Sequence, residues 1–526
     1  MKQKIKLAVR VCVLGVLSAF AVILPGLGNE GFYIDVGIVQ RFGEEPEDEI
    51  VLASRPDNAP LRVEFEEDGD AIALETNRLT LEIENQALDK PKVRERVVLS
   101  DHATFETAES SAKTWEERGL LVEVTQPGRW QVWAKTDIYR SPLLRRFLLA
   151  SLEEEGYETP YLHTEVLEEV PIVSFEVNGE RYEVENLEVR HKGETIEVDA
   201  SDAPRRLYPG SLQLQPNSYG NYTLVNTVEV EDYLRGVVPH EIGHNVPFEA
   251  VKAQAIIART YALKNLHRFQ ADDYELCATV HCQVYWGWNE TNDRSDRAIE
   301  DTAKQVLSHD GKLVDALYSS TTGGVTAYFN DIWDGKQRPY LKSVIDSTKP
   351  VWDLEKRPLN QEENFRQFMD QKQGFNETGS RAFRWQRKSK IEELTEDLQK
   401  YLERINHPDA EAVTEIKEIT VTARSRSGRI LEMDVATNQG TITLEKTEVR
   451  SALGPPRSTL FYLKPVKNNN GELTGYEFIG GGFGHGVGLS QIGAHHLARE
   501  GWSAREILSF YYPETDMIRL EEVVEQ

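Results

Sequence analysis

Hydrophobic and polar positions alternate in short β-rich runs along residues 170–230, and a helical spacing follows them. The runs are separated by turn dipeptides, at Asn178-Gly179, Lys192-Gly193, Pro209-Gly210 and Tyr219-Gly220. Residues 247–266 instead place small and apolar side chains at helical spacing, and Pro247 suits the first turn of a helix. The pattern therefore predicts a β-rich platform followed by a closely packed helix.

A second alternation lies upstream and predicts a small α+β module over residues 91–165. We expect a strand, a helix, two strands and a helix, at residues 96–99, 108–117, 120–125, 130–134 and 142–154. This order faintly resembles that of the SPOR-type peptidoglycan-binding domain. Because no motif in it is specific, an ordinary small α+β domain is the other interpretation.

Two charged segments complete the predicted organisation. Residues 43–70 are rich in Glu, Asp and Pro, a composition typical of solvated linkers, so we assign residues 29–90 to an acidic linker with short strands. Residues 353–411 are also highly charged, which predicts a solvated insertion within one large domain over residues 166–520. The predicted fold class is α+β, with the small module preceding a large domain of platform and packed helices.

Composition and charge exclude several classes of protein. The chain has 526 residues, and 40% of them are hydrophobic. This is enough for real cores and for about two to four domains. The 87 acidic side chains outnumber the 60 basic ones, which gives a formal net charge of −27. Because nucleic-acid binding depends on Lys and Arg near phosphates, this balance argues against nucleic acid and against docking on an anionic membrane.

The first residues have the pattern of an export signal. Four basic side chains precede an apolar run over residues 11–24, namely Lys2, Lys4, Lys6 and Arg10. The run is shorter than the roughly 20 residues that span a membrane, so a cleaved signal and a retained N-terminal anchor both stay open for residues 1–28. We expect a protein exported to the periplasm or cell envelope, either free or tethered to the inner membrane.

Three separated motifs carry the candidate chemistry. They read YLRGVVPHE at 233–241, SSTTGGVT at 319–326 and GGGFGHGVGLSQIGA at 480–494. Together and in this order, they resemble the SpoIID/LytB domain family of peptidoglycan-acting proteins, over roughly residues 205–513. Known members include lytic transglycosylases, which cut the glycan between N-acetylmuramic acid and N-acetylglucosamine, and proteins described as enhancers of a wall amidase.

The resemblance implies a catalytic role for Glu241, at the position of the family's catalytic glutamate. Breaking a glycosidic bond needs a protonated carboxylic acid near the leaving oxygen, and we expect a loop to hold Glu241 at an apolar pocket wall. A lytic enzyme needs only this acid, because the C6 hydroxyl of the substrate attacks, whereas hydrolases usually need a second carboxylate. No cofactor is then required for the chemistry. The alternative is that Glu241 caps the following helix.

This motif departs from the family pattern around the glutamate. Members typically carry a small polar residue before it and Met-Pro after it, whereas here His240 precedes it and Ile242-Gly243-His244 follow. The preference for glycan subsites is therefore open. Arg259 matches a family arginine that would orient or neutralise the carboxylate, and a surface ion pair is its alternative role.

The other two motifs predict polar substrate contacts. Glycine runs let backbone approach a ligand closely, and the resemblance favours substrate positioning by His485, Ser490 and Gln491. Tight packing of strands is the alternative use of such glycines. Ser320 and Thr321 are expected to line the cleft, because no nucleophile elbow accompanies them.

Two cysteines and a histidine form the remaining constellation. Cys277, His281 and Cys282 could supply three ligands to a structural zinc ion, with His267 as a fourth, and some relatives bind zinc at a similar place. In an oxidising compartment, a disulfide between Cys277 and Cys282 is one alternative to zinc, and two packed thiols are another. The sequence leaves all three open.

We therefore predict a peptidoglycan lytic transglycosylase, with glycan strands as its substrate. The chief rival is a non-catalytic module that holds glycan and enhances a cell-wall amidase, which would then be its partner. A third hypothesis is a structural envelope protein with a closed cleft.

Overall fold

A computed structural model of the protein describes residues 31–524, apart from residues 46, 56–58, 194 and 201–202. The predicted signal or anchor at residues 1–28 lies outside the described residues. In the part that is described, no helix is both long and apolar enough to cross a membrane. Helices and strands are mixed throughout, so the α+β fold class is confirmed.

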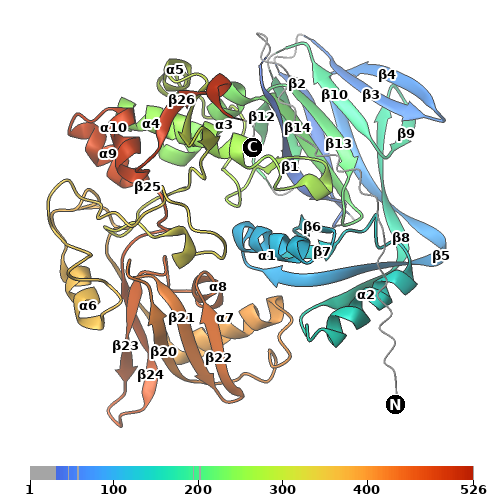
Figure 1. The fold of residues 1–526 in the computed structure, drawn as a ribbon. Helices are drawn as coiled ribbons and strands as arrows, with labels where there is room; N and C mark the ends of the chain where they lie inside the picture. Colours follow the sequence, from blue (N-terminus) through green and yellow to red (C-terminus); the bar gives the residue numbers. More distant parts are fainter. Residues whose placement is uncertain (1–30, 46, 56–58, 194, 201–202, 525–526) are drawn as a thin grey trace, which may run out of the picture.

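Two large sheets form the platform in the upper right of Figure 1. The first has the order β15-β1-β14-β13-β10-β3-β4, and its bounds are Tyr33–Phe42 (β1), Leu61–Glu67 (β3), Asp70–Thr76 (β4), Leu187–His191 (β10), Ser211–Pro216 (β13), Tyr222–Glu229 (β14) and Leu276–Cys277 (β15). The second has the order β12-β11-β2-β5-β7-β6, with β8 on β5 and β9 on β8. Its bounds are Glu49–Arg55 (β2), Arg78–His102 (β5), Val122–Thr125 (β6), Trp130–Ala134 (β7), Tyr161–Val177 (β8), Glu180–Val184 (β9), Thr195–Ala200 (β11) and Arg206–Tyr208 (β12).

The acidic segment at residues 43–70 is folded into these sheets and is not a solvated linker. Leu52 in β2 and Val63 in β3 are completely buried in the platform core. In β3 the buried apolar positions alternate with glutamates that face outward, because successive side chains of a strand point to opposite faces. The acidic composition reflects the solvent face of these strands, so the prediction of a linker was wrong.

The small module contains the elements that its sequence predicts. Helices α1 (Phe105–Glu117) and α2 (Pro142–Glu154) accompany β6 and β7, and aromatic side chains fill a separate core. The long strands β5 and β8 pair from Glu82 opposite Ser174 to Val98 opposite Tyr161, and so continue from the platform into the module. The module therefore shares a sheet with the platform. Its likeness to SPOR domains stays a prediction.

Helix α4 (Phe248–Lys264) is the centre of the helical layer and is buried along nearly its whole length. Small side chains such as Ala255 and Ala258 let the neighbouring helices approach it closely, as the sequence predicts. Those neighbours are α3 (Val230–Ile242), α5 (Asp293–Asp301), α9 (Gln491–Arg499) and α10 (Ala504–Tyr511). Short strands and 3-10 turns complete the layer. The strands are Gln305–His309 (β16), Lys312–Leu313 (β17), Tyr318–Ser319 (β18), Leu489–Ser490 (β25) and Asp516–Arg519 (β26). The 3-10 turns are Gln270–Asp272 (η1), Phe329–Asp331 (η2) and Leu520–Glu522 (η3).

A C-terminal lobe, drawn in yellow and orange in the lower left of Figure 1, replaces the predicted surface insertion. Two three-stranded sheets have the orders β19-β24-β23 and β20-β21-β22. The bounds are Glu362–Asp370 (α6), Trp385–Lys390 (β19), Ile391–Arg404 (α7), Ile416–Arg424 (β20), Ile430–Thr437 (β21), Gly440–Glu445 (β22), Glu448–Ala452 (α8), Phe461–Lys467 (β23) and Leu473–Gly480 (β24). Leu394, Leu398 and Met433 are buried in this lobe's own core. The charged helix at 390–405 is therefore one wall of a folded lobe that extends well beyond residue 411.

Candidate functional site

A cavity of about 730 Å³ lies where the helical layer, the small module and the C-terminal lobe meet. Glu241 from α3, Phe105 from α1 and residues of the segment after α4 line it. Its lining also includes Ser320 after β18, Arg450 in α8 and His485 in the glycine-rich segment. Of the residues predicted to act on substrate, Glu241, Ser320 and His485 are thus brought to one cavity, and His281 and Cys282 of the predicted metal set line it as well.

Glu241 lies in the last turn of α3 and not in a loop as the sequence predicts. It does not cap the next helix, because Pro247 occupies the N-cap position of α4. The backbone N–H of Val284 donates to Oε1 of Glu241 at 2.9 Å, and the Gln491 side chain donates to the Glu241 carbonyl at 2.9 Å. Gln491 therefore positions the glutamate. Burial raises the pKa of the Glu241 carboxyl, against the opposing effect of the Val284 hydrogen bond.

A hydrogen-bonded group of two buried side chains, Gln283 and Tyr233, and the partly buried Tyr318 adjoins Glu241, and sequence reasoning missed it. Gln283 donates to the Tyr318 hydroxyl at 3.1 Å and accepts from the Tyr233 hydroxyl at 3.2 Å. Hydrogen bonding to the Tyr318 side chain lowers the pKa of Glu241, in part offsetting its burial. Burial and the charge of Glu241 raise the pKa of Tyr318 well above its usual range, so this hydroxyl keeps its proton. Tyr318 directly precedes the SSTTGG motif, and this adjacency was the available signal.

Arg259 does not reach the cavity. Its guanidinium is completely buried and pairs with Glu231, with Nε donating to Oε1 at 2.8 Å, while Nη1 donates to the Gln305 carbonyl at 3.1 Å. Arg259 lies in α4 as the sequence predicts, but its side chain ties α4 to the first turn of α3 instead of to Glu241. The structure matches neither the predicted catalytic role nor the alternative of a surface ion pair.

A buried carboxylate, Glu377, organises the SSTTGG turn. Its oxygens accept from the backbone N–H groups of Gly323 at 2.9 Å and Gly324 at 3.0 Å, from the Thr322 N–H, and from the Ser490 hydroxyl at 2.6 Å. Ser490 also caps α9, and Thr321 is completely buried with its backbone bonded to Phe483. Ser490 and Thr321 therefore hold the cavity wall together, and the prediction that they contact substrate was wrong.

The glycine-rich segment packs against the protein's own backbone. Gly482, Gly484, Gly486 and Gly488 all have positive φ, the conformation that side chains other than glycine rarely adopt. A Cβ added to Gly488 would lie 2.0 Å from the Leu317 carbonyl oxygen. The glycines thus serve close packing, which is the alternative that the sequence left open, and the packing aims Phe483, 47% exposed, and His485 at the cavity.

His485 carries no charge. Burial and the nearby guanidinium of Arg450 lower its pKa to about 3. Its Nδ1 accepts from the Val487 N–H at 3.0 Å, and the ring lies 5.0 Å from that of Trp333. A neutral imidazole at this place can orient a ligand, but it is not an acid at physiological pH.

Comparison with known proteins agrees with this geometry. The family model described as stage II sporulation protein, SpoIID, matches residues 218–309, and a domain of unknown function matches residues 327–488. These matches, with the relatives described below, support the SpoIID/LytB family for this chain. Glu241 falls in the first match and His485 in the second, so the cavity of this SpoIID/LytB protein is built from both.

Three relatives give the extent of the likeness. An uncharacterised protein of Brachyspira hyodysenteriae is 29% identical over 315 residues, 59% of this chain and 72% of the relative. The amidase enhancer of Bacillus subtilis is 28% identical over 54% of this chain but only 40% of its own length. Stage II sporulation protein D of the same species is 26% identical over 63% of this chain and 88% of the relative.

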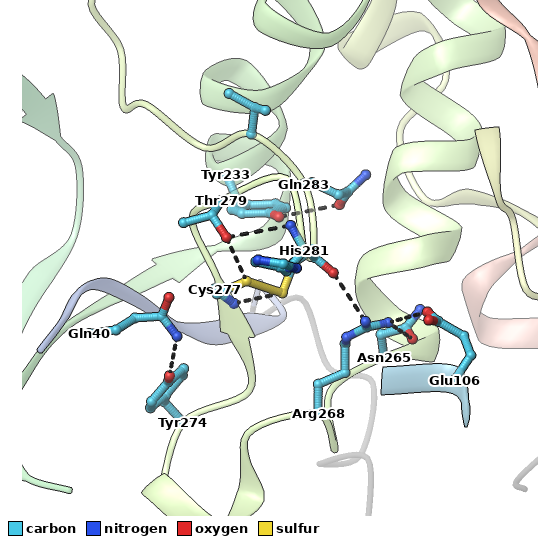
Figure 2. Close-up of a disulfide and its surroundings, with 12 residues drawn as sticks. Gln40, Glu106, Tyr233, Asn265, Arg268, Tyr274, Cys277, Thr279, His281 and Gln283 are labelled. Atoms are coloured by element: carbon cyan, nitrogen blue, oxygen red, sulfur yellow. Dashed lines mark hydrogen bonds and ion pairs between the residues drawn. A yellow bond between two sulfur atoms is a disulfide. The ribbon is translucent and has the colours of Figure 1, made fainter. Parts of the chain in front are cut away.

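The cysteines of this SpoIID/LytB protein form a disulfide, shown in Figure 2. The sulfurs of Cys277 and Cys282 are bonded to each other, so neither is a thiolate that could bind zinc. His267, the predicted fourth ligand, lies 3.0 Å from a Glu109 oxygen. These residues do not fit a zinc site. Across the described residues, no group of three or more Cys, His, Asp and Glu side chains is arranged to hold a metal. The disulfide closes the loop that leads to Val284.

Arg268 binds the second carboxylate of the cavity and was also missed. Figure 2 shows its buried guanidinium between Glu106 and His281. It lies 3.0 Å from a Glu106 oxygen and donates to the His281 carbonyl at 3.0 Å. It also lies over the Phe105 ring, 4.2 Å from the ring centroid. Glu106 is thereby neutralised by a fixed cation. Of the carboxylates that line the cavity, Glu241 is the one without a basic partner among the described residues.

Proposed function

We propose that this SpoIID/LytB protein is a peptidoglycan lytic transglycosylase in which Glu241 is both general acid and general base. The observation that carries the proposal is a single carboxyl group of raised pKa, without a basic partner among the described residues, on the wall of a cavity. Two free carboxylates would favour hydrolysis, because one of them could act as nucleophile or activate water. Here the second carboxylate, Glu106, is paired with Arg268.

The proposed reaction regenerates the enzyme without water. Protonated Glu241 gives its proton to the leaving oxygen of N-acetylglucosamine as the bond from C1 of N-acetylmuramic acid breaks. The Glu241 carboxylate then takes the proton of the muramoyl C6 hydroxyl as that oxygen bonds to C1. The products are a 1,6-anhydro-muramic end and a strand with a free hydroxyl. The Val284 N–H stabilises the carboxylate between the two steps, because it donates to Oε1.

The substrate also places the protein outside the cytoplasm in this proposal. The basic and apolar pattern of residues 1–28 supports export, either with cleavage or with a retained anchor, and a disulfide persists in an oxidising compartment. A cell-envelope location therefore belongs to the proposed function.

The test is digestion of purified glycan strands by the full chain, followed by mass spectrometry of the ends. We expect anhydro-muramic ends with the parent protein and with the control Glu290→Gln, whose side chain is exposed. We expect at least a 100-fold loss with Glu241→Gln, because that amide cannot transfer the proton. Equal product from Glu241→Gln, or reducing ends in place of anhydro ends, would reject the enzyme.

A second candidate, supported by the likeness to the amidase enhancer, is a module that binds glycan and stimulates a cell-wall amidase. It predicts that Glu241→Gln keeps full stimulation of the amidase. Measuring amidase release of stem peptides with the parent and the variant separates the two functions, since only the transglycosylase depends on a titratable group at this position.

A further inference from the structure

We propose that Arg450 binds a carboxylate of the glycan substrate inside the cavity that contains Glu241. The inference rests on the proposed function for the identity of the ligand, but its binding test does not require cleavage. Arg450 belongs to α8 of the C-terminal lobe, within the stretch at residues 327–488 that matches a domain of unknown function. It lines the cavity together with Thr447 and Ser451 of the same lobe.

The guanidinium of Arg450 has no partner within the described part of the chain. Its side chain makes no ion pair and donates no hydrogen bond there, and its Nε is buried without an acceptor. Burial lowers the pKa of Arg450, and no carboxylate opposes that effect. The other cavity arginine, Arg268, has Glu106, Asn265 and a carbonyl as partners. Arg450 as a whole is half-buried, and its charge is unpaired. An unpaired cation that is partly removed from water is costly, so a site that keeps one is suited to an anionic ligand.

The position of Arg450 fixes where such an anion would lie. Arg450 is close enough to His485 for its charge to lower the pKa of that imidazole, so the anion would share the cavity with His485 and Glu241. Guanidinium groups match carboxylates in a planar, two-bond geometry. The surroundings supply uncharged groups from Ser320 and Phe483, which suit the sugar ring. The arrangement therefore recognises a sugar that carries an acidic side chain.

Muramic acid is such a sugar, and its carboxylate has two sources. The lactyl group ends in a free carboxylate when no stem peptide is attached, and becomes an amide when the peptide is present. The stem peptide itself carries carboxylates further from the ring. The lactyl carboxylate and the stem-peptide carboxylates present the same chemistry to Arg450, whereas N-acetylglucosamine carries no carboxylate. Binding at Arg450 would thus place the muramoyl residue, and not its neighbour, beside Glu241.

The test measures binding without cleavage, in the Glu241→Gln background. Three ligands are compared: peptide-free glycan chains, the same chains with their lactyl carboxylates converted to amides, and chains that keep stem peptides. We expect Arg450→Gln to weaken binding of acidic chains by roughly tenfold to a hundredfold, Arg450→Lys to recover part of it, and the exposed control Arg499→Gln to change nothing.

Each outcome decides the inference. A loss on peptide-free chains that disappears after amidation supports the lactyl carboxylate as ligand, and a loss confined to peptide-bearing chains supports a stem-peptide carboxylate. Equal binding of all three ligands by Arg450→Gln and its parent overturns the proposal. Thermal unfolding checks that Arg450→Gln is folded. If the parent protein with Glu241 makes no anhydro ends while Arg450 still controls binding, the proposed activity fails and this inference stands.

Discussion

The backbone N–H of Val284 donates to Oε1 of Glu241 at 2.9 Å, and this bond joins the segment directly after the disulfide loop to the last turn of α3. Val284 lies two residues beyond Cys282, so the disulfide lies beside the candidate acid's hydrogen-bond donor. The pKa of Glu241 is raised by burial and lowered by this same bond, so the loop helps to set how strongly the carboxyl holds its proton.

The first prediction concerns stability and pH. Folding raises the pKa of Glu241, so between its unfolded and folded pKa values the native state binds more protons at this group than the unfolded state does. The contribution of Glu241 to the free energy of unfolding is therefore fully present below the unfolded pKa and is lost as the pH rises through the folded pKa. Glu241→Gln does not titrate. We expect it to be more stable than the parent near neutral pH and equally stable at low pH, measured by urea unfolding across pH. A difference that grows on acidification would contradict a raised pKa.

The second prediction concerns the disulfide. Closing so short a loop stabilises the fold by about 2 kcal/mol in the chain-entropy model, so we expect Cys277→Ser with Cys282→Ser to lower the free energy of unfolding by about that amount. Activity should fall as well, because the loop leads directly to Val284, whose N–H donates to Glu241. The check is denaturant unfolding beside glycan digestion. A thiol assay that finds Cys277 and Cys282 free, with stoichiometric zinc in the purified protein, would contradict the disulfide.

The third prediction concerns Glu377. Its carboxylate accepts from several buried donors of the SSTTGG turn and from Ser490, so Glu377→Gln would set an amide group against those donors. We expect a loss of about 3 kcal/mol or more in the free energy of unfolding, from equilibrium denaturation. Ser490→Ala removes one of these donors and should cost only about 1 kcal/mol. Equal costs for the two variants would show that Glu377 does not organise the turn.

The fourth prediction separates structure from catalysis at Arg259. Removing one partner of a buried ion pair leaves a charge uncompensated and costs about 3–5 kcal/mol, so Arg259→Met should strongly destabilise the protein. Glu231→Gln is the milder matched variant. In both, cleavage per folded molecule should stay near that of the parent, measured at a temperature where each is folded. A large loss of cleavage with unchanged stability would restore the catalytic role that the sequence suggests.

The site shows that sequence motifs predict which segments come together better than they predict where the side chains of those segments point. The three motifs do converge, and Glu241, Ser320 and His485 line one cavity as expected. Thr321 and Ser490 sit in the same motifs but are buried, because neighbouring residues in a tight turn point in different directions. Ser490 donates to the buried Glu377, and the Thr321 hydroxyl donates to the Ala382 carbonyl. Nothing in a sequence motif distinguishes these two orientations.

The fold was predictable where pattern and tertiary packing agree. The small module and α4 follow their periodicities, whereas α3 was expected as a loop because Gly236 and Pro239 are poor helix residues. Its buried face outweighs that local preference, since Val237 and Val238 are completely buried. Arg268 and Arg450 were missed because they act through contacts between distant segments, which no local pattern records.

The central claim is that Glu241 cleaves glycan without water, and digestion of peptide-free strands in water enriched in heavy oxygen tests it most directly. We predict anhydro-muramic ends that carry no label, with the product lost in Glu241→Gln. Labelled reducing ends, or anhydro ends made equally well by Glu241→Gln, would contradict the account.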